Sequence, residues 1–192
     1  MRQVWDSWGD VLVAWTLAVP LVVIAAGWLV RLRIGRGQPR GEALRSTIAE
    51  LGILLGTLPW VWMILTPVHG ERHVILLPLK DLIETLADAS TNTVVQVGAN
   101  LVLFVPLGFF LPLRFPRFAG VLRMMSVGAA LSAALEIAQY VLDLGRYSSI
   151  DDVLMNAAGA GIGAYLARVH VARREAERSY SSRVLLRLGW SS

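Results

Sequence analysis

The chain has 192 residues, of which 55% are hydrophobic and 17% are charged, and its mean hydropathy is +0.57. Soluble domains carry about 25% charged residues, so this composition indicates a membrane protein. The net charge of +4 does not indicate a nucleic-acid partner, because the arginines lie in short loops between apolar runs, and the absence of cysteine excludes disulfides and thiolate metal sites.

The first predicted membrane span covers residues 11–30, a run of 20 residues without a charge. Such a run is long enough to cross a hydrocarbon core of about 30 Å. A signal peptide is the alternative, but the start of the chain sets Arg2 against Asp6 and Asp10, and the apolar run is too long for one. Residues 1–10 are therefore predicted to form a short N-terminus outside the membrane.

The second predicted span covers residues 47–66, and Glu50 lies near its arginine-rich end, where its side chain can snorkel toward the surface. The connection that follows holds Leu79, Leu82, Ile83 and Leu86 at helical spacing, which predicts a short amphipathic helix in the membrane interface. His69 and His73 lack further ligands nearby and are interpreted as solvated loop residues. We predict neither a metal site nor a cofactor.

The third and fourth spans are predicted at residues 93–113 and 121–142. Pro106 and Pro112 predict a kink or local break in the third span. The fifth span, residues 150–169, carries a GxxxG pair at Gly159 and Gly163. Such small-residue faces allow close helix packing and are compatible with a homo-oligomer. Residues 170–192 then form a basic tail, which we expect to rest on the inner membrane surface.

The basic residues predict the orientation. The loops after the first and third spans and the tail, counted together with Arg123 and Arg168 at the adjoining ends of the fourth and fifth spans, hold 14 of the 18 basic residues. The positive-inside rule therefore places the N-terminus outside and the C-terminus inside. The predicted fold class is all-α: a polytopic membrane helix bundle of five transmembrane helices plus the short interfacial helix, with a transmembrane domain over residues 11–169.

This topology brings a set of polar residues to the outer leaflet. Ionisable residues inside a membrane span cost about 2.5–3.5 kcal/mol at the helix centre and indicate function by default. The candidate binding residues are Asn100, Glu136, Gln139, Arg146, Asp151, Asp152 and Asn156.

Structural roles compete with this interpretation. Ser148 with Asp151, and Ser149 with Asp152, both fit a capping box, and we assign the cap role to Asp151. Arg146 has Asp143 and the cap aspartates as alternative ion-pair partners, and the asparagines could be interhelical hydrogen-bond donors. Taken together on one side of the membrane, the residues favour a functional site.

Two blocks of this sequence resemble the VanZ-like family of small bacterial membrane proteins. The first is N-L-V-L-F-V-P-L-G-F-F-L-P from Asn100 to Pro112, and the second runs from Glu136 through Asp151-Asp152 to Gly163. The resemblance covers roughly residues 51–168. Ser149 stands where the family often has a further aspartate, and the region of Pro78 lacks the usual asparagine and phenylalanine.

The resemblance implies an integral membrane protein of the bacterial cell envelope, located in the cytoplasmic membrane. The founding member of the family is associated with low-level resistance to teicoplanin, a lipid-tailed glycopeptide. Our preferred hypothesis is a non-enzymatic binder of a lipid-linked cell-wall precursor or lipoglycopeptide in the outer leaflet. The alternative is a membrane enzyme in which Glu136 and Asp152 act as general acid and base on an envelope lipid. A transporter fits less well, because the chain shows no internal repeat. A divalent cation at Asp152, Glu136 and Asn156 has suitable oxygen ligands but no diagnostic spacing.

Overall fold

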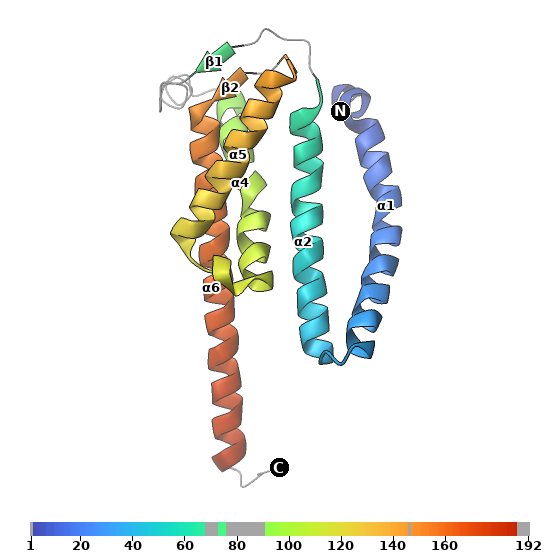
Figure 1. Cartoon of the computed structure of the whole chain (residues 1–192), viewed down its shortest axis with the longest axis vertical. Helices are drawn as coiled ribbons and strands as arrows, with labels where there is room; N and C mark the ends of the chain where they lie inside the picture. Colours follow the sequence, from blue (N-terminus) through green and yellow to red (C-terminus); the bar gives the residue numbers. More distant parts are fainter. Residues whose placement is uncertain (1, 68–72, 76–90, 146, 188–192) are drawn as a thin grey trace. The chain divides into compact units, whose positions relative to one another are not determined.

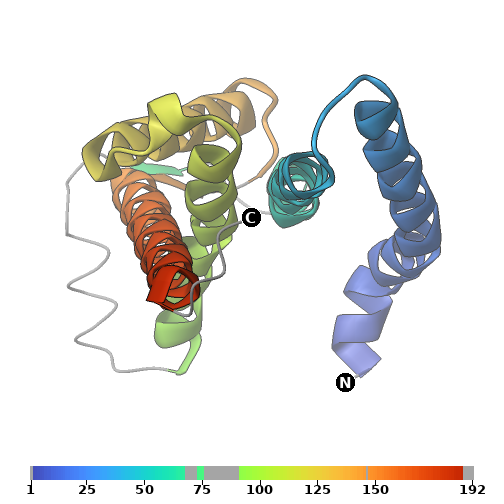
Figure 2. The same ribbon diagram turned by 90° about the horizontal axis from the view of Figure 1, so that it is seen from below.

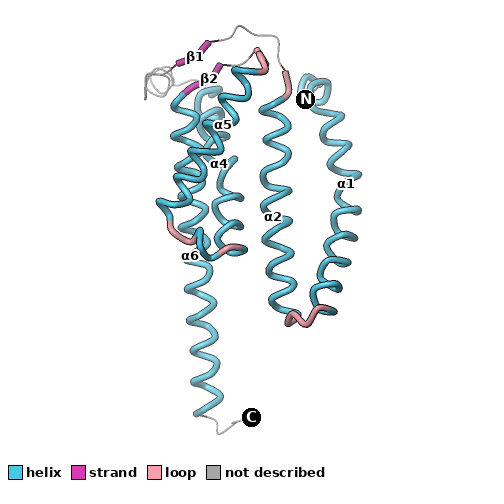
Figure 3. The backbone as a smooth tube through the Cα atoms, in the orientation of Figure 1, coloured by secondary structure: helices cyan, strands magenta, loops and turns pink. Residues whose placement is uncertain are grey.

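The computed structural model describes residues 2–67, 73–75, 91–145 and 147–187. Helix accounts for nearly all of this backbone (Figure 3). The chain divides into two units, Met1–Leu51 and Gly52–Ser192, and the boundary falls within helix α2. The elements, labelled in Figure 1, are α1 (Arg2–Gly35), α2 (Arg40–Leu65), β1 (His73–Ile75), α4 (Thr91–Arg114), the 3-10 helix η1 (Pro116–Phe118), α5 (Val121–Val141), β2 (Tyr147–Ser149) and α6 (Ile150–Arg187).

The first unit is a helical hairpin of α1 and the beginning of α2. Gly37 turns the chain with a positive φ of 88°, a conformation that glycine adopts without steric cost. Arg33 joins the two helices, because its Nη1 donates to Thr47 Oγ1 at 2.8 Å and its Nη2 lies 2.6 Å from Glu50 Oε2. The sequence placed Glu50 at the membrane edge, and the structure adds its ion-pair partner. This ion pair fixes the register of the hairpin.

The second unit is built on close packing between α4, α5 and α6. Figure 2 shows α4 and α6 side by side, with α5 crossing them. A side chain at Gly163 would collide with backbone atoms of α4, including Phe109 N, and one at Gly108 would collide with Ala160. Small residues therefore allow the two backbones to approach closely. The buried core residues are Phe104, Leu107, Met124, Ala160 and Ala164.

The last part of α2 contacts α4 through two further glycines. A side chain at Gly56 would collide with Pro106, and one at Gly52 would collide with the ring of Phe110. The prediction was a kink or a local break in this span. The helix α4 is continuous through Pro106 and Pro112, so the break is wrong, and the kink stays a prediction. Pro106 instead provides a packing surface for α2.

A short parallel strand pair lies at the start of α6. His73 pairs with Tyr147, Val74 with Ser148 and Ile75 with Ser149. The all-α prediction did not include these strands, because three-residue strands carry no readable alternation. The pair ties the segment around residue 74 to the turn between α5 and α6.

Apolar length alone supports part of the predicted span count. Of the described residues, three helical segments are long and apolar enough to cross a membrane: Thr16–Gly35, Arg40–Leu65 and Val121–Val141. Gly98–Arg114 is a shorter apolar helix. The α6 segment is not among them. Its glycines, Asn156 and the charged residues at both ends of its apolar stretch, Asp151, Asp152 and Arg168, lower its hydropathy. The count of five spans is thus not confirmed by this criterion, and the predicted interfacial helix over residues 79–86 lies outside the described residues.

The C-terminal part of the chain continues as helix. α6 runs without interruption from Ile150 to Arg187, so the residues after 169 extend the predicted fifth span as one helix. Its last buried residue is Ala167, and residues 171–183 are all exposed. The Gly159 and Gly163 face packs against α4 within the same chain. A homo-oligomer stays a prediction, and this face is already occupied.

Candidate functional site

The predicted polar residues lie at one end of the α4, α5 and α6 packing, beside the strand pair. α5 ends at Val141 and α6 begins at Ile150, so Glu136 and Gln139 occupy the last two turns of α5, while Asp152 and Asn156 occupy the first two turns of α6. Asn100 reaches the same end from α4 through its contact with Asp152. The predicted convergence of these residues follows from the order of the helices.

The first link joins α4 to α6. Asn100 Nδ2 donates a hydrogen bond to Asp152 Oδ1, and both side chains are partly buried. An amide donor to a carboxylate oxygen forms a charge-assisted hydrogen bond, which is stronger than a neutral one. It holds one Asp152 oxygen toward the interior of the unit.

The second link joins α5 to α6. Asn156 Nδ2 donates to Ser132 Oγ at 2.8 Å, and these residues are only 5% and 1% exposed. The other amide atom, Asn156 Oδ1, is also buried and has no hydrogen-bond partner among the described residues. The sequence identified Asn156 but not Ser132, because a serine among alanines gives no signal of a specific partner.

The third link joins α5 to the end of α2. Gln139 Nε2 donates to the carbonyl oxygen of Ile64 at 3.0 Å, and Gln139 is 7% exposed. Its Oε1 atom is buried and lacks a partner among the described residues. Glu136 precedes Gln139 by three residues on the same helical face, and its Oε2 atom is buried. The helix α2, in which the sequence indicated no site residue, therefore contributes to the site through a backbone carbonyl.

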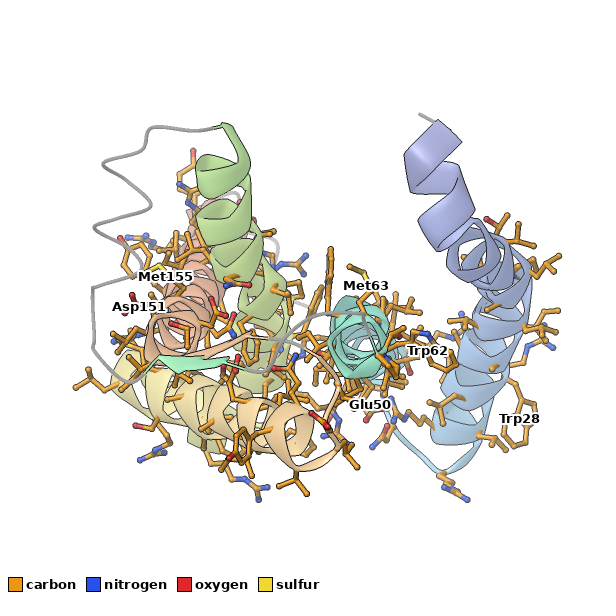
Figure 4. All side chains as sticks on the ribbon, turned by 90° about the horizontal axis from the view of Figure 1, so that it is seen from above. Trp28, Glu50, Trp62, Met63, Asp151 and Met155 are labelled. Atoms are coloured by element: carbon orange, nitrogen blue, oxygen red, sulfur yellow. The ribbon has the colours of Figure 1, made fainter. Side chains whose placement is uncertain are left out.

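The start of α6 is capped by a serine. Ser149 Oγ accepts a hydrogen bond from the backbone N–H of Asp151 at 3.3 Å, as expected for an N-cap residue. Asp151 itself lies in the first turn, where a carboxylate is stabilised by the helix dipole, and it is 5% exposed. Figure 4 shows Asp151 and Met155 on the same side of α6. Arg146, the one cation expected here, lies outside the described residues.

An apolar hollow lies next to these polar residues, one helical turn further from the end of α5. It is lined by Thr57, Val61, Leu103, Phe104, Leu107, Leu131 and Leu135. Leu135 precedes Gln139 by four residues, and Val61 precedes Ile64 by three. The hollow therefore lies about one helical turn from the Gln139–Ile64 hydrogen bond between α5 and α2. Polar and apolar surfaces thus adjoin between α2, α4 and α5.

The chemistry available at this end is that of oxygen acceptors. Carboxylates of Asp152 and Glu136 and the amide oxygens of Gln139 and Asn156 can accept hydrogen bonds from ligand N–H or O–H groups. Within the part of the chain that the structure describes, no group of three His, Cys, Asp or Glu side chains is placed to hold a metal ion. These acceptors suit recognition of a hydroxyl- or amide-bearing group.

The chain matches a known protein family. The family model described as VanZ/LLP1 matches residues 51–171, which contain α4, α5, α6 up to the start of its exposed extension, and the end of α2. The matched region includes every candidate site residue. No curated protein and no solved structure is significantly similar to the chain.

Proposed function

Because the chain belongs to the VanZ/LLP1 family, we propose that it is a multi-pass protein of the bacterial cytoplasmic membrane that binds a lipid-linked cell-wall precursor or lipoglycopeptide. Binding would take place at the outer leaflet and contribute to teicoplanin-type resistance. The family match and the apolar helices support a membrane protein of VanZ type.

The proposed topology has five spans, with the N-terminus outside and the C-terminus inside. Its support is the distribution of charge along α6. From Asp152 to Arg173 this helix rises about 32 Å at ~1.5 Å per residue, which is close to the thickness of a hydrocarbon core. Arg168 is the charged residue between them, and it lies near the far end, where arginine can snorkel to the surface. α6 thus has the length and charge pattern of a span although its hydropathy is modest.

The observation that carries the binding proposal is the pair of buried amide oxygens without partners among the described residues, Gln139 Oε1 and Asn156 Oδ1. An unsatisfied buried acceptor costs about 1–3 kcal/mol, so such atoms are retained where a ligand or water supplies the donor. Both lie on helices that also present a carboxylate, Glu136 or Asp152. Peptide and sugar groups of envelope precursors carry the N–H and O–H donors that match these acceptors.

The second candidate is a membrane enzyme that uses Glu136 and Asp152 as general acid and base on an envelope lipid. The buried Oε2 of Glu136 favours this hypothesis, because a carboxyl group shielded from water is suited to proton transfer. The two hypotheses differ in their response to Asp152→Asn. This change keeps an oxygen for Asn100 but removes the charge, so a binder weakens by degrees whereas an enzyme loses turnover.

The test is antibiotic sensitivity in a glycopeptide-susceptible host that expresses the protein, with teicoplanin and vancomycin compared side by side. Wild type is compared with Asp152→Asn and with Asp143→Asn, an exposed acid at the same end of the unit, after membrane fractions show equal insertion. We expect selective protection against teicoplanin that Asp152→Asn reduces and Asp143→Asn retains. Absence of protection by the wild type refutes the resistance role. Complete loss with Asp152→Asn, together with a changed envelope lipid in wild-type cells, supports the enzyme instead.

A further inference from the structure

The end of the second unit opposite the candidate site is strongly basic. α4 ends at Arg114, η1 follows directly, α5 begins at Val121, and α6 leaves the packed core after Ala167. These four segments carry arginines that we call the basic collar: Arg114, Arg117, Arg123, Arg168, Arg173 and Arg174.

The contacts along α4 and α6 place the collar arginines at similar depth. The two helices run in the same direction, since Asn100 contacts Asp152, Gly163 packs on Phe109, and the rings of Phe109 and His170 lie 5.9 Å apart. Continuing this register by five residues brings Arg114 level with the α6 turn that carries Arg173 and Arg174. The collar therefore forms one band around the unit.

Aromatic rings hold part of the collar in place. The guanidinium of Arg114 lies 4.7 Å from the ring centre of Phe115, and that of Arg117 lies 5.3 Å from Phe115 and 5.0 Å from Phe118. Arg123 donates to the carbonyl oxygen of Arg117, which draws a third guanidinium to the same turn. Stacking uses the flat faces of the guanidinium groups, whereas phosphate is recognised by their in-plane N–H groups.

Carboxylates do not balance this charge. From residue 100 to residue 177, four acids lie at the site end, in the last turns of α5, the following turn and the first turn of α6: Glu136, Asp143, Asp151 and Asp152. Glu175 and Glu177 follow the collar on α6, so two carboxylates lie beside six collar arginines. Among the described residues, five of the collar arginines form no ion pair with a carboxylate: Arg117, Arg123, Arg168, Arg173 and Arg174. Like charges at one depth repel, so the band requires counter-anions.

We propose that the basic collar is a binding site for the phosphate headgroups of anionic phospholipids. The collar lies about 32 Å along α6 from Asp152, one hydrocarbon thickness away, so its depth is that of a headgroup layer. Exposed apolar side chains border it, including Leu122 at 78% and Leu166 at 45% exposure, and acyl chains of the same lipids would cover them. A soluble acidic partner would match the arginines but leave this apolar surface exposed.

The helix beyond the collar provides a matched control. Arg183 is exposed on α6 like Arg173, but it lies about 14 Å beyond Arg174 at ~1.5 Å per residue. That distance exceeds the screening length of about 8 Å at physiological ionic strength. A headgroup bound at the collar is therefore sensitive to Arg173 and insensitive to Arg183.

The experiment measures phosphatidylglycerol and phosphatidylcholine binding to the purified full chain in a neutral detergent by native mass spectrometry. The proteins compared are wild type, Arg173→Gln, Arg183→Gln and the double variant Arg117→Gln/Arg173→Gln. An arginine near an anionic surface contributes about fivefold to binding. We expect about fivefold weaker phosphatidylglycerol binding for Arg173→Gln, roughly 25-fold weaker binding for the double variant, and less than about twofold for Arg183→Gln. Equal unfolding temperatures for the four proteins show that the changes act on binding.

Three results overturn the proposal. Phosphatidylcholine that binds as well as phosphatidylglycerol shows that the phosphate charge is not recognised at the collar. Equal losses for Arg173→Gln and Arg183→Gln show that general charge attraction, and not a site, causes binding. Displacement of the lipid by polyglutamate at lower concentration than by added phosphatidylglycerol shows that an acidic polypeptide is the better ligand.

Discussion

Replacing Gly163 with alanine tests the close approach of α4 and α6, on which the geometry of the candidate site depends. A Cβ at this position would lie 2.7 Å from Phe109 N and 2.8 Å from the carbonyl carbon of Gly108. Carbon in ordinary contact needs ~3.5 Å, and the carbonyl oxygen of Val105 lies closer still, so the helices must separate locally by more than about 0.8 Å. Backbone atoms cannot rotate away as a flexible side chain can, so the strain is not relieved by a change of rotamer.

The expected change in stability follows from two opposing effects. Glycine to alanine in a helix favours the helix by about 1 kcal/mol, whereas overpacking of a close contact costs about 1–3 kcal/mol. Because the opposing atoms are backbone, we expect the upper part of that range and a net loss of about 1–2 kcal/mol. Gly98, on α4, has nothing within 4 Å of its added Cβ and serves as the control. Gly98→Ala is expected to be neutral or stabilising.

The assay is thermal unfolding of the full chain in detergent, followed by far-UV circular dichroism. Gly163→Ala should unfold at a lower temperature than wild type, and Gly98→Ala at the same or a higher temperature. Separation of the helices also lengthens the distance between Asn100 and Asp152. Teicoplanin protection should therefore fall with Gly163→Ala but not with Gly98→Ala. If the two alanine variants are equally stable, the close packing of α4 and α6 inferred here is wrong.

Two further predictions concern the hydrogen bond between Asn156 and Ser132 and the ion pair between Arg33 and Glu50. Ser132→Ala removes the acceptor of the buried Asn156 amide and should lower the free energy of unfolding by about 0.6–1.7 kcal/mol, whereas Ser126→Ala, on an exposed face, should change it by less than about 0.5 kcal/mol. Equal effects in denaturant unfolding would show that burial of the first bond is unimportant. Glu50→Gln weakens the ion pair of the α1–α2 hairpin, whose side chains are 14% and 27% exposed, and should cost about 1–3 kcal/mol. The control is Glu42→Gln, an exposed change in the first turn of α2. The measurement is the rate of proteolysis at the hairpin turn, which should be faster in Glu50→Gln. Equal rates in the two variants contradict the role of the ion pair.

The helices and much of the site could be predicted from the sequence because they depend on local patterns. The apolar run over residues 121–142 predicted the bounds of α5 to within one residue at each end. Asp152 and Asn156 are four residues apart, a spacing that places them on one helical face. The choice of partners could not be read in this way, since it depends on helix rotation, which the glycine contacts between α4 and α6 determine. Ser132 was accordingly overlooked as the acceptor for Asn156.

The behaviour of α4 and the strand pair required tertiary information. Pro106 predicts a break by local rules, but membrane helices tolerate proline when neighbouring groups pack around it, and Gly56 leaves the space for that packing. Strands of three residues give no periodic signal, and β1 and β2 are far apart in the sequence. The helix after residue 169 is rich in Arg, Glu and Ala, which have high helix propensity, although its apolar run has ended.

The pairing of β1 with β2 has a consequence for the order in which the protein assembles. Residues 73–75 are synthesised before α4 and α5, yet their hydrogen-bonding partners, residues 147–149, are synthesised only after both helices. A nascent chain must therefore keep this segment unpaired until residues 147–149 have also been synthesised. The strand pair closes beside Ser149, the cap of α6, so the ends of α5 and α6 that carry the candidate site become linked to the earlier part of the chain late in translation. Chains truncated before residue 147 would insert the earlier helices and still lack both the strand pair and the site.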